Sequence, residues 1–218
     1  MTYQTIVADP PWDYAERFRR GASGFGHGAS GFSKSGTRPP YPTMRLAAIE
    51  ALPVEAMAAR DSHLWLWTTN AFMEEAHRVA RGWGFRPISI LTWRKVNGDG
   101  TVSKGGMGYY LRSATEHVIF AVRGSLPPCE RNAITVFDAP RLPHSTKPDE
   151  FYRIVERLSP APRVDVFARR TRLGWDAIGD ELGKPFIPAP PDDTKADRAG
   201  SPQGGQDAAR TPLDGGRQ

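Results

Sequence analysis

The chain has 218 residues, with six Trp, ten Phe, a single Cys and a formal net charge of +5. This length suits one domain with a real hydrophobic core, and the lone Cys129 excludes an internal disulfide framework. No stretch has the length of a membrane span, and no signal peptide precedes the first predicted strand. We therefore expect a cytoplasmic protein.

The first predicted strand ends at Asp9-Pro10-Pro11-Trp12. Two prolines cannot continue a β-ladder because they lack an N–H, so a carboxylate lies at the carboxyl end of the strand. Ligands bind at that edge of an open α/β sheet. A carboxylate, the Pro10 carbonyl and an aromatic ring together suit chemistry on the amino group of a base. The plain alternative is a strand end with a Pro-rich turn and a core Trp.

Residues 14–40 are rich in Gly and Ser, carry five basic side chains and show no apolar periodicity. This composition predicts a flexible loop that departs from the strand of Asp9 and lies over the site. We expect its basic residues, including Arg17, Arg19 and Arg20, to contact substrate phosphates. A solvated insertion is the alternative.

Strands and helices are predicted to alternate along the rest of the chain. The strands are predicted at 63–68, 87–96, 116–122, 134–137 and 163–168, and the helices at 43–50, 70–81 and 146–158. Thr43, Asn70 and Thr146 are the predicted helix caps. The alternation predicts an α/β fold with a mostly parallel, doubly wound sheet.

Basic residues stand at two further positions of interest. If the strands are parallel, Arg94 and Lys95 lie at the same sheet edge as Asp9. Lys147 stands at the amino end of a predicted helix, where the helix dipole disfavours a cation, which suggests that an anionic ligand group binds there. Solvated positions without a role remain the alternative for all three basic residues.

The positive charge belongs to the predicted domain at 1–184, which holds 25 Lys and Arg against 19 Asp and Glu. Twenty of the 25 are Arg, which suits phosphate recognition and hence a nucleic-acid partner. A source whose codons favour Arg is the alternative. Residues 185–218 are rich in Pro and Gly with few large apolar groups, so we expect a disordered C-terminal tail. No Cys and His set has the spacing of a zinc site.

The Asp9-Pro10-Pro11-Trp12 motif resembles the catalytic motif of the MT-A70 family of adenine-N6 methyltransferases, whose members modify RNA in eukaryotes and DNA in bacteria and phages. Four further blocks resemble the family in the same order: Tyr41-Pro42-Thr43-Met44, residues 64–68, Thr115-Glu116-His117, and residues 147–175. The similarity spans residues 5–183. It implies a Rossmann-like S-adenosylmethionine-dependent methyltransferase fold with a circularly permuted motif order.

The resemblance also implies roles for individual residues. The catalytic residues would be Asp9, Pro10, Pro11 and Trp12. The residues that bind S-adenosylmethionine would be Asp9, Lys147, Asp165, Phe167, Arg169, Thr171, Arg172, Asp180 and Glu181. The substrate residues would be Trp12, which would stack a flipped base, with Tyr41, Arg94, Lys95, Arg17, Arg19 and Arg20.

Two departures from the family pattern affect the cofactor residues. Some family members have the run Pro-His-Asn at the position of Arg170-Thr171-Arg172. Many have Asn at the position of Asp180. A basic turn that touches nucleic acid is the alternative for residues 169–172. The implied reaction is methylation of adenine N6 in DNA. The same reaction on RNA, methylation of cytosine N4, and a non-catalytic nucleic-acid-binding partner remain alternatives, and the oligomeric state stays open.

Overall fold

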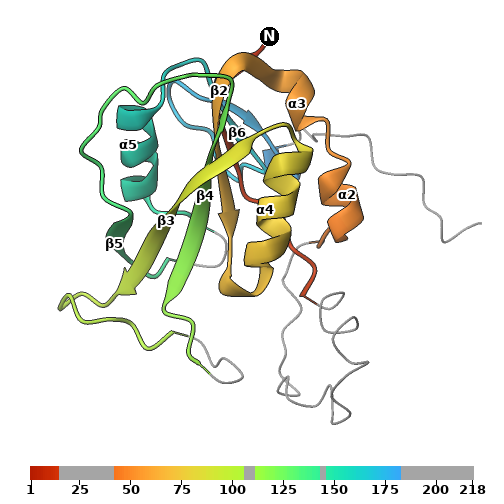
Figure 1. Ribbon diagram of the computed structural model, residues 1–218. Coiled ribbons are helices and arrows are strands. Elements are labelled where there is room, and N and C mark those ends of the chain that lie inside the picture. The colour runs from red at the N-terminus through yellow and green to blue at the C-terminus, as the bar shows by residue number, and fades with distance from the viewer. Residues whose placement is uncertain (15–41, 106–110, 143–145, 183–218) are drawn as a thin grey trace, which may run out of the picture. The chain divides into compact units, whose positions relative to one another are not determined.

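The computed structural model, shown in Figure 1, describes residues 1–14, 42–105, 111–142 and 146–182. Its described part has seven strands in one sheet, in the order β5-β3-β4-β2-β1-β6-β7. The strands are β1 (Tyr3–Ala8), β2 (Ala58–Thr68), β3 (Arg86–Val96), β4 (Thr115–Arg123), β5 (Val136–Pro140), β6 (Arg163–Val166) and β7 (Asp176–Ile178). Only β4 runs in the direction opposite to that of the other six strands. The predicted mostly parallel, Rossmann-like α/β fold is confirmed.

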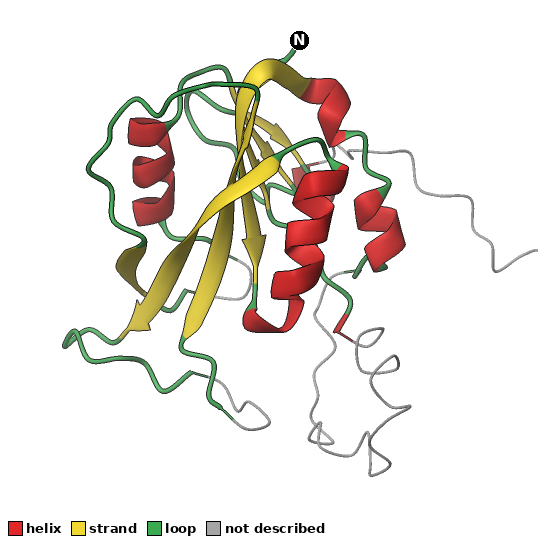
Figure 2. Ribbon diagram, viewed as in Figure 1, coloured by secondary structure: helices red, strands yellow, loops and turns green. Residues whose placement is uncertain are grey.

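Helices cover both faces of this sheet (Figure 2). The described helices are α2 (Leu46–Glu50), α3 (Val54–Met57), α4 (Met73–Gly82) and α5 (Asp149–Leu158), with 3₁₀ turns η2 (Asn70–Phe72) and η3 (Asp180–Leu182). Helix α5 lies on one face, and α2 and α4 lie on the other. None of the helices in the described part is long and apolar enough to cross a membrane.

The three predicted helix caps are wrong. The residues at the cap positions are Arg45, Phe72 and Pro148, and none of them makes a side-chain cap hydrogen bond. Asn70 opens the turn η2, and its Oδ1 contacts Nε2 of His117 at 2.8 Å. Helix α5 begins instead with Asp149 and Glu150, whose charges complement the positive end of the helix dipole.

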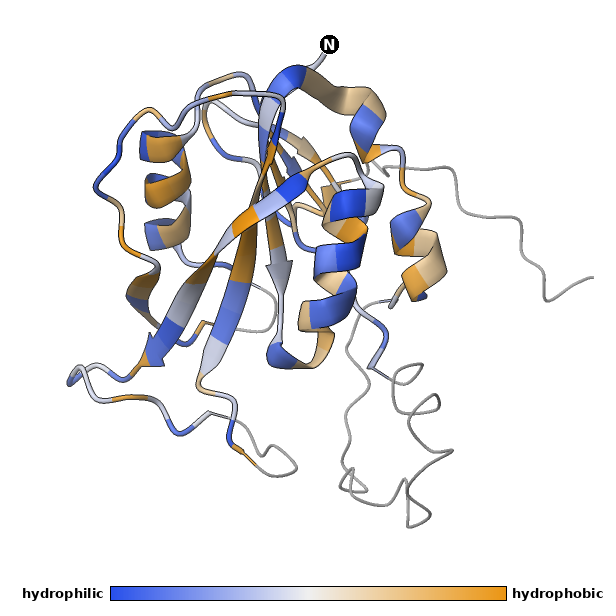
Figure 3. Cartoon of the chain, in the orientation of Figure 1, coloured by the Kyte–Doolittle hydropathy of each residue, from blue (hydrophilic) through white to orange (hydrophobic). Residues whose placement is uncertain are grey.

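Aromatic side chains fill the space between α5 and the sheet. Phe151 of α5 is fully buried, and its ring centroid lies 4.7 Å from that of Trp67 and 6.2 Å from that of Trp65. Figure 3 shows hydrophilic residues on the face of α4 that is turned toward the viewer, with hydrophobic stretches in the strands behind it. Each residue of β2 from 63 to 68 is buried, as a central strand covered on both faces requires.

A neutral cluster of His63, Trp65 and Ser159 lies within this core. His63 Nε2 donates to the Leu126 carbonyl at 3.0 Å, because a carbonyl oxygen can only accept. Nδ1 of the neutral ring therefore accepts from the Ser159 hydroxyl at 2.8 Å, and the Trp65 indole donates to that hydroxyl oxygen at 3.0 Å. Burial lowers the pKa of His63. Every polar side-chain atom of the neutral cluster has a partner.

One edge of the sheet gathers the carboxyl ends of β1, β2, β3 and β6, and we call it the carboxyl edge (lower edge in Figure 1). Because β4 is antiparallel, its amino end with Glu116 reaches the same edge. Arg94 and Lys95 lie there as well, as predicted for parallel strands. The topology thus brings together residues that lie far apart in the sequence.

Candidate active site

Asp9 follows β1 at the carboxyl edge, and its backbone ties β1 to β6. The Asp9 N–H donates to the Val166 carbonyl at 3.3 Å, and the parallel register places Val7 beside Asp165. The strands that carry Asp9 and Asp165 are therefore direct neighbours in the sheet. Two carboxyl groups from neighbouring strands therefore face one part of the edge.

The two prolines after Asp9 form a turn that is held at three points. The Trp12 N–H donates to the Pro10 carbonyl at 2.9 Å, and the Met44 N–H donates to the Pro11 carbonyl at 2.8 Å. The Trp12 indole donates to the Trp67 carbonyl at 3.2 Å. A carbonyl oxygen has two lone pairs, so the Pro10 carbonyl can still accept one further hydrogen bond.

The ring of Trp12 is part of the core in this conformation. It is only 6% exposed, and it stacks on Phe72 with centroids 5.3 Å apart and an interplanar angle of 20°. Phe72 covers one face of this ring, so a substrate base could stack only on the other face. Its observed contacts instead fix the turn that carries the Pro10 carbonyl.

Four charged side chains, Asp9, Lys147, Glu116 and Lys95, form an ionic network along the carboxyl edge. Lys147 Nζ lies 3.1 Å from Asp9 Oδ2 and 3.0 Å from Glu116 Oε2. Lys95 Nζ lies 2.6 Å from Glu116 Oε1. Positive and negative groups alternate along the network, and each side chain is between 12% and 24% exposed.

The pKa values of the ionic network reflect both burial and pairing. Burial raises the pKa of Asp9, although the Lys147 ammonium opposes this effect. Burial also acts to raise the pKa of Glu116, but Lys147 and Lys95 outweigh it and lower that pKa. Burial acts to lower the pKa of Lys147, and the two carboxylates reverse this and raise it. Lys147 and Glu116 are therefore ionised at neutral pH.

Asp165 lies beside this network on β6 and is bound by Tyr152 of α5. The Tyr152 hydroxyl donates to Asp165 Oδ2 at 2.7 Å. Burial raises the pKa of Asp165 to about 7, although the bond from Tyr152 lowers it. Arg172 lies over the Tyr152 ring, with its guanidinium carbon 3.7 Å from the centroid, and donates to Asp149 at 2.8 Å.

The segment after β6 has an unusual backbone at Phe167. This half-buried residue has φ = 68°, in the left-handed region that costs a non-glycine residue roughly 1–2 kcal/mol. Next to it, Gly179 lies so close to the Ala168 carbonyl that an added Cβ would be 2.1 Å from the oxygen. The backbone is therefore strained at the carboxyl edge, and strained residues often occur at ligand sites.

The remaining predicted site residues have different surroundings. Arg169 is half-buried, whereas Thr171 and Asp180 are exposed. Arg94 is exposed and makes a bidentate pair with Asp138, at 2.7 and 2.5 Å. Tyr41, Arg17, Arg19 and Arg20 lie outside the described residues, as do the side chain of Glu181 and the predicted tail at 185–218.

The sequence assigned no role to Glu116, Tyr152 or Asp138. Glu116 belongs to a block that resembles the MT-A70 family, and this block was the only signal for it. Tyr152 follows an ordinary helical apolar pattern, and Asp138 lies in a short edge strand. Among the described residues, no group of three or more His, Cys, Asp or Glu side chains has the arrangement of a metal site.

Comparison with known proteins identifies the family. The MT-A70 family model matches residues 3–181. The chain belongs to the MT-A70 family. It is similar to the Type II methyltransferase M.MunI of Mycoplasma sp, with 30% identity over 83% of this chain and 78% of that protein.

Eukaryotic members of the MT-A70 family are also similar to this chain. The N(6)-adenosine-methyltransferase MT-A70-like protein of Arabidopsis thaliana is 28% identical, and the N(6)-adenosine-methyltransferase catalytic subunit METTL3 of Homo sapiens is 26% identical. Each similarity covers 83% of this chain but only 24% and 28% of those longer proteins.

MT-A70 methyltransferases depend on S-adenosylmethionine, and the residues at the carboxyl edge fit this cofactor. A buried ammonium at Lys147 can pair with a carboxylate, and the carboxyl groups of Asp9 and Asp165 suit the cationic and hydroxyl groups of the cofactor. The Trp67 indole N–H beside Lys147 is buried and has no hydrogen-bond partner among the described residues. The predicted cofactor is therefore consistent with both the family and the donor set.

Proposed function

We propose that this chain transfers a methyl group from S-adenosylmethionine to N6 of adenine in DNA. One observation carries the proposal: the Asp9 carboxylate pairs with the Lys147 ammonium at the carboxyl edge, and the carbonyl of the next residue, Pro10, is fixed by the Trp12 N–H. The motif and its surroundings match a family of adenine methyltransferases.

Two acceptors beside each other suit the N6 amine. Its lone pair is delocalised into the purine ring, so it is a poor nucleophile. Asp9 would accept one N–H and the Pro10 carbonyl the other, which would localise the lone pair and orient it toward the methyl donor. Pro11 and Trp12 would hold the turn rigid, since the Pro11 carbonyl and the Trp12 indole are both bonded to other elements.

The cofactor supplies an electrophilic methyl group on a positively charged sulfonium. Transfer would break the sulfur–methyl bond and leave a neutral thioether, and the methylated N6 would then lose one proton to solvent. Lys147 would bind its carboxylate, and Asp165 would accept hydrogen bonds from its hydroxyl groups. We also assign Phe167, Arg169, Thr171, Arg172, Asp180 and Glu181 to this site on the basis of their match to the family. A sulfonium near Asp9 would lower the pKa of Asp9 and keep it ionised.

DNA is the proposed substrate because the bacterial members of the family act on DNA, and this chain covers most of the bacterial relative M.MunI. Methylation of RNA is the second candidate, favoured by the similarity to METTL3. We propose that the substrate contacts come from Trp12, Tyr41, Arg94, Lys95, Arg17, Arg19 and Arg20. Location in the cytoplasm remains a prediction.

The test is methyl transfer from labelled S-adenosylmethionine to double-stranded DNA, single-stranded DNA and RNA in parallel. We expect label in N6-methyladenine that is lost in Asp9→Asn and kept in Glu130→Gln, whose side chain pairs with Arg157 on the surface. Preference among the three nucleic acids identifies the substrate. Cofactor binding without label on any of them would contradict the proposed reaction.

A further inference from the structure

Glu116 lies between two lysines and contacts both with separate oxygens. Oε1 is 2.6 Å from Lys95 Nζ, and Oε2 is 3.0 Å from Lys147 Nζ. Lys147 in turn contacts Asp9, the proposed catalytic carboxylate. Glu116 therefore reaches the reacting groups only through Lys147.

Aromatic rings restrict both ammonium groups. Lys147 Nζ lies 4.7 Å from the centroid of the Trp67 ring, and Lys95 Nζ lies 4.9 Å from that of Trp93. Trp67 and Trp93 are 1% and 2% exposed, so neither ring can move without repacking the core. Each lysine is thus held by one ring face and by Glu116.

The donors of Lys147 can be counted. An ammonium has three N–H groups, of which one faces Asp9 and one faces Glu116. The third makes no salt bridge among the described residues, and the proposed function assigns it to the cofactor carboxylate. Without Glu116, Asp9 would be the one carboxylate among the described residues that forms a salt bridge with this ammonium, and it would do so while it also accepts an N–H from the substrate.

We propose that Glu116 is a positioning residue, which holds the Lys147 ammonium at a fixed place between Asp9 and the cofactor throughout the reaction. Lys95 anchors Glu116 from the other side. This inference rests on the proposed function. Glu116 does not act as a base itself, because both of its oxygens are occupied by lysine ammonium groups.

The charge of Glu116 also affects Asp9. Glu116 raises the pKa of Asp9, so its removal lowers that pKa. The charged and titratable groups that face Asp9 are Lys147, Glu116, Arg169, Asp165 and Tyr152. Only the contribution of Glu116 changes directly in a Glu116→Gln variant.

The experiment compares wild type, Glu116→Gln, Glu116→Asp and Glu130→Gln, the last as a matched surface control. In Glu116→Gln we expect kcat to fall by roughly 10- to 100-fold, because misplacement by about 1 Å has effects of this size. The acid limb of the pH profile of kcat shifts to lower pH. Glu116→Asp keeps the charge but shortens the side chain, so its acid limb stays near that of wild type while kcat stays low.

Signals of the lysine ammonium groups in ¹H–¹⁵N spectra give a second readout that does not depend on activity. We expect slowly exchanging signals from Lys95 and Lys147 in wild type and weaker signals in Glu116→Gln. Unchanged kcat, acid limb and lysine signals in Glu116→Gln would overturn the inference, as would full recovery of kcat in Glu116→Asp. A wild-type protein that transfers no methyl group would refute the proposed function, while the lysine signals and the dissociation constant for S-adenosylmethionine would still test Glu116.

Discussion

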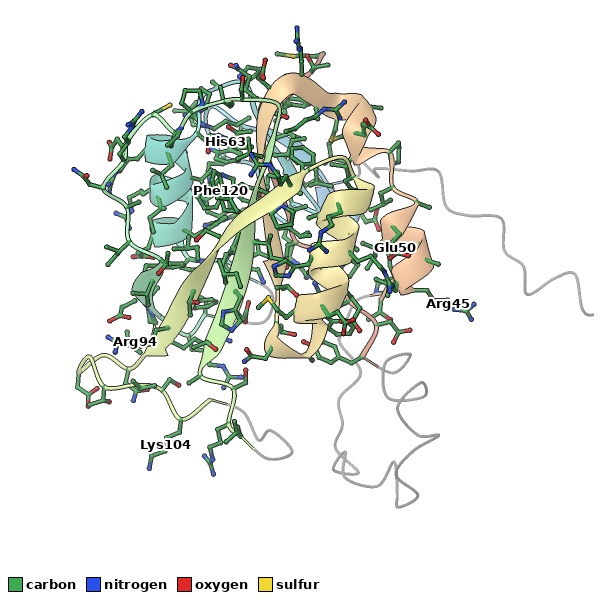
Figure 4. The ribbon with its side chains drawn as sticks, viewed as in Figure 1. Arg45, Glu50, His63, Arg94, Lys104 and Phe120 are labelled. Atoms are coloured by element: carbon green, nitrogen blue, oxygen red, sulfur yellow. The ribbon has the colours of Figure 1, made fainter. Side chains whose placement is uncertain are left out.

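The ionic network and the neutral cluster are two buried polar groups near opposite ends of the same sheet. Figure 4 shows His63, of the neutral cluster, in the upper part of the molecule and Arg94, at the carboxyl edge, in the lower part. The neutral cluster contains no ionised group and satisfies all of its polar side-chain atoms. The ionic network contains four charges and keeps part of its surface open.

This difference separates a structural role from a functional one. A neutral, fully bonded cluster costs little desolvation and fixes the packing of β2 against the end of α5. Ion pairs that are largely buried lose much of their hydration, and apolar residues often replace them without loss of stability. Charges that are kept at the ligand-binding edge, with shifted pKa values, therefore indicate a site that serves chemistry.

The largest expected effect is that of Lys147→Met. This change leaves the carboxylates of Asp9 and Glu116 without their shared cation, so we expect the free energy of unfolding to fall by about 3 kcal/mol. Binding of S-adenosylmethionine should be lost as well. Denaturant unfolding and calorimetry measure both effects, with the exposed Lys104→Met as the control. An equally stable variant would show that the network is not a coupled unit.

Ser159→Ala tests the neutral cluster and should have a smaller effect. The Trp65 indole and His63 Nδ1 lose their shared partner, which costs about 1–3 kcal/mol in the free energy of unfolding. Affinity for S-adenosylmethionine should not change. Ser125→Ala, at an exposed position, serves as the control. A loss of cofactor affinity in Ser159→Ala comparable to that in Lys147→Met would remove the distinction between the two groups.

The sequence predicted the strands of the fold better than its details. Clear apolar runs such as residues 64–67 mark central strands, because burial on both faces requires them. The reversed direction of β4 was not predictable, since the segment between β3 and β4 has no pattern that distinguishes a hairpin from a crossover. The cap at Asn70 was wrong because its side chain contacts His117 on another element, which is a tertiary effect.

The site could be predicted only in part for a related reason. Asp9 and Lys147 have local signals, a strand end and a basic residue before a helix, and the family resemblance strengthened both. Glu116 pairs with Lys95, 21 positions away in the sequence, and with Lys147, 31 positions away. No local sequence pattern predicts these pairs. Burial of Trp12 likewise depends on Phe72, which belongs to a different element.

The pH dependence of stability gives a third test, because His63 is buried as a neutral ring. The pKa of His63 is lowered in the folded protein from its value of about 6.5 in the unfolded chain. Below pH 6.5, the unfolded chain therefore binds more protons than the folded protein. The contribution of His63 is therefore complete above that pH and is lost as the pH falls through it, by at most about 1.4 kcal/mol per pH unit. The difference between wild-type and His63→Asn unfolding curves isolates this contribution, because Asp165 titrates in both proteins. A difference that does not change with pH would contradict the neutral assignment.

The smallest expected effect concerns Tyr152, which joins the core to the carboxyl edge. Burial raises the pKa of Asp165 to about 7, and the hydrogen bond from the Tyr152 hydroxyl partly opposes this increase. In Tyr152→Phe the bond is lost, the pKa of Asp165 rises further, and more of the carboxyl group is protonated at neutral pH. If ionised Asp165 accepts cofactor hydroxyls, affinity for S-adenosylmethionine increases with pH through about 7 in wild type and at a higher pH in the variant.

Calorimetry across this range measures the shift, and Tyr3→Phe, which loses a surface bond to Asp176, should show none. Because a neutral carboxylic acid can still accept hydrogen bonds, the affinity should decrease only modestly, and coincident curves for Tyr152→Phe and wild type would exclude Asp165 from the cofactor site.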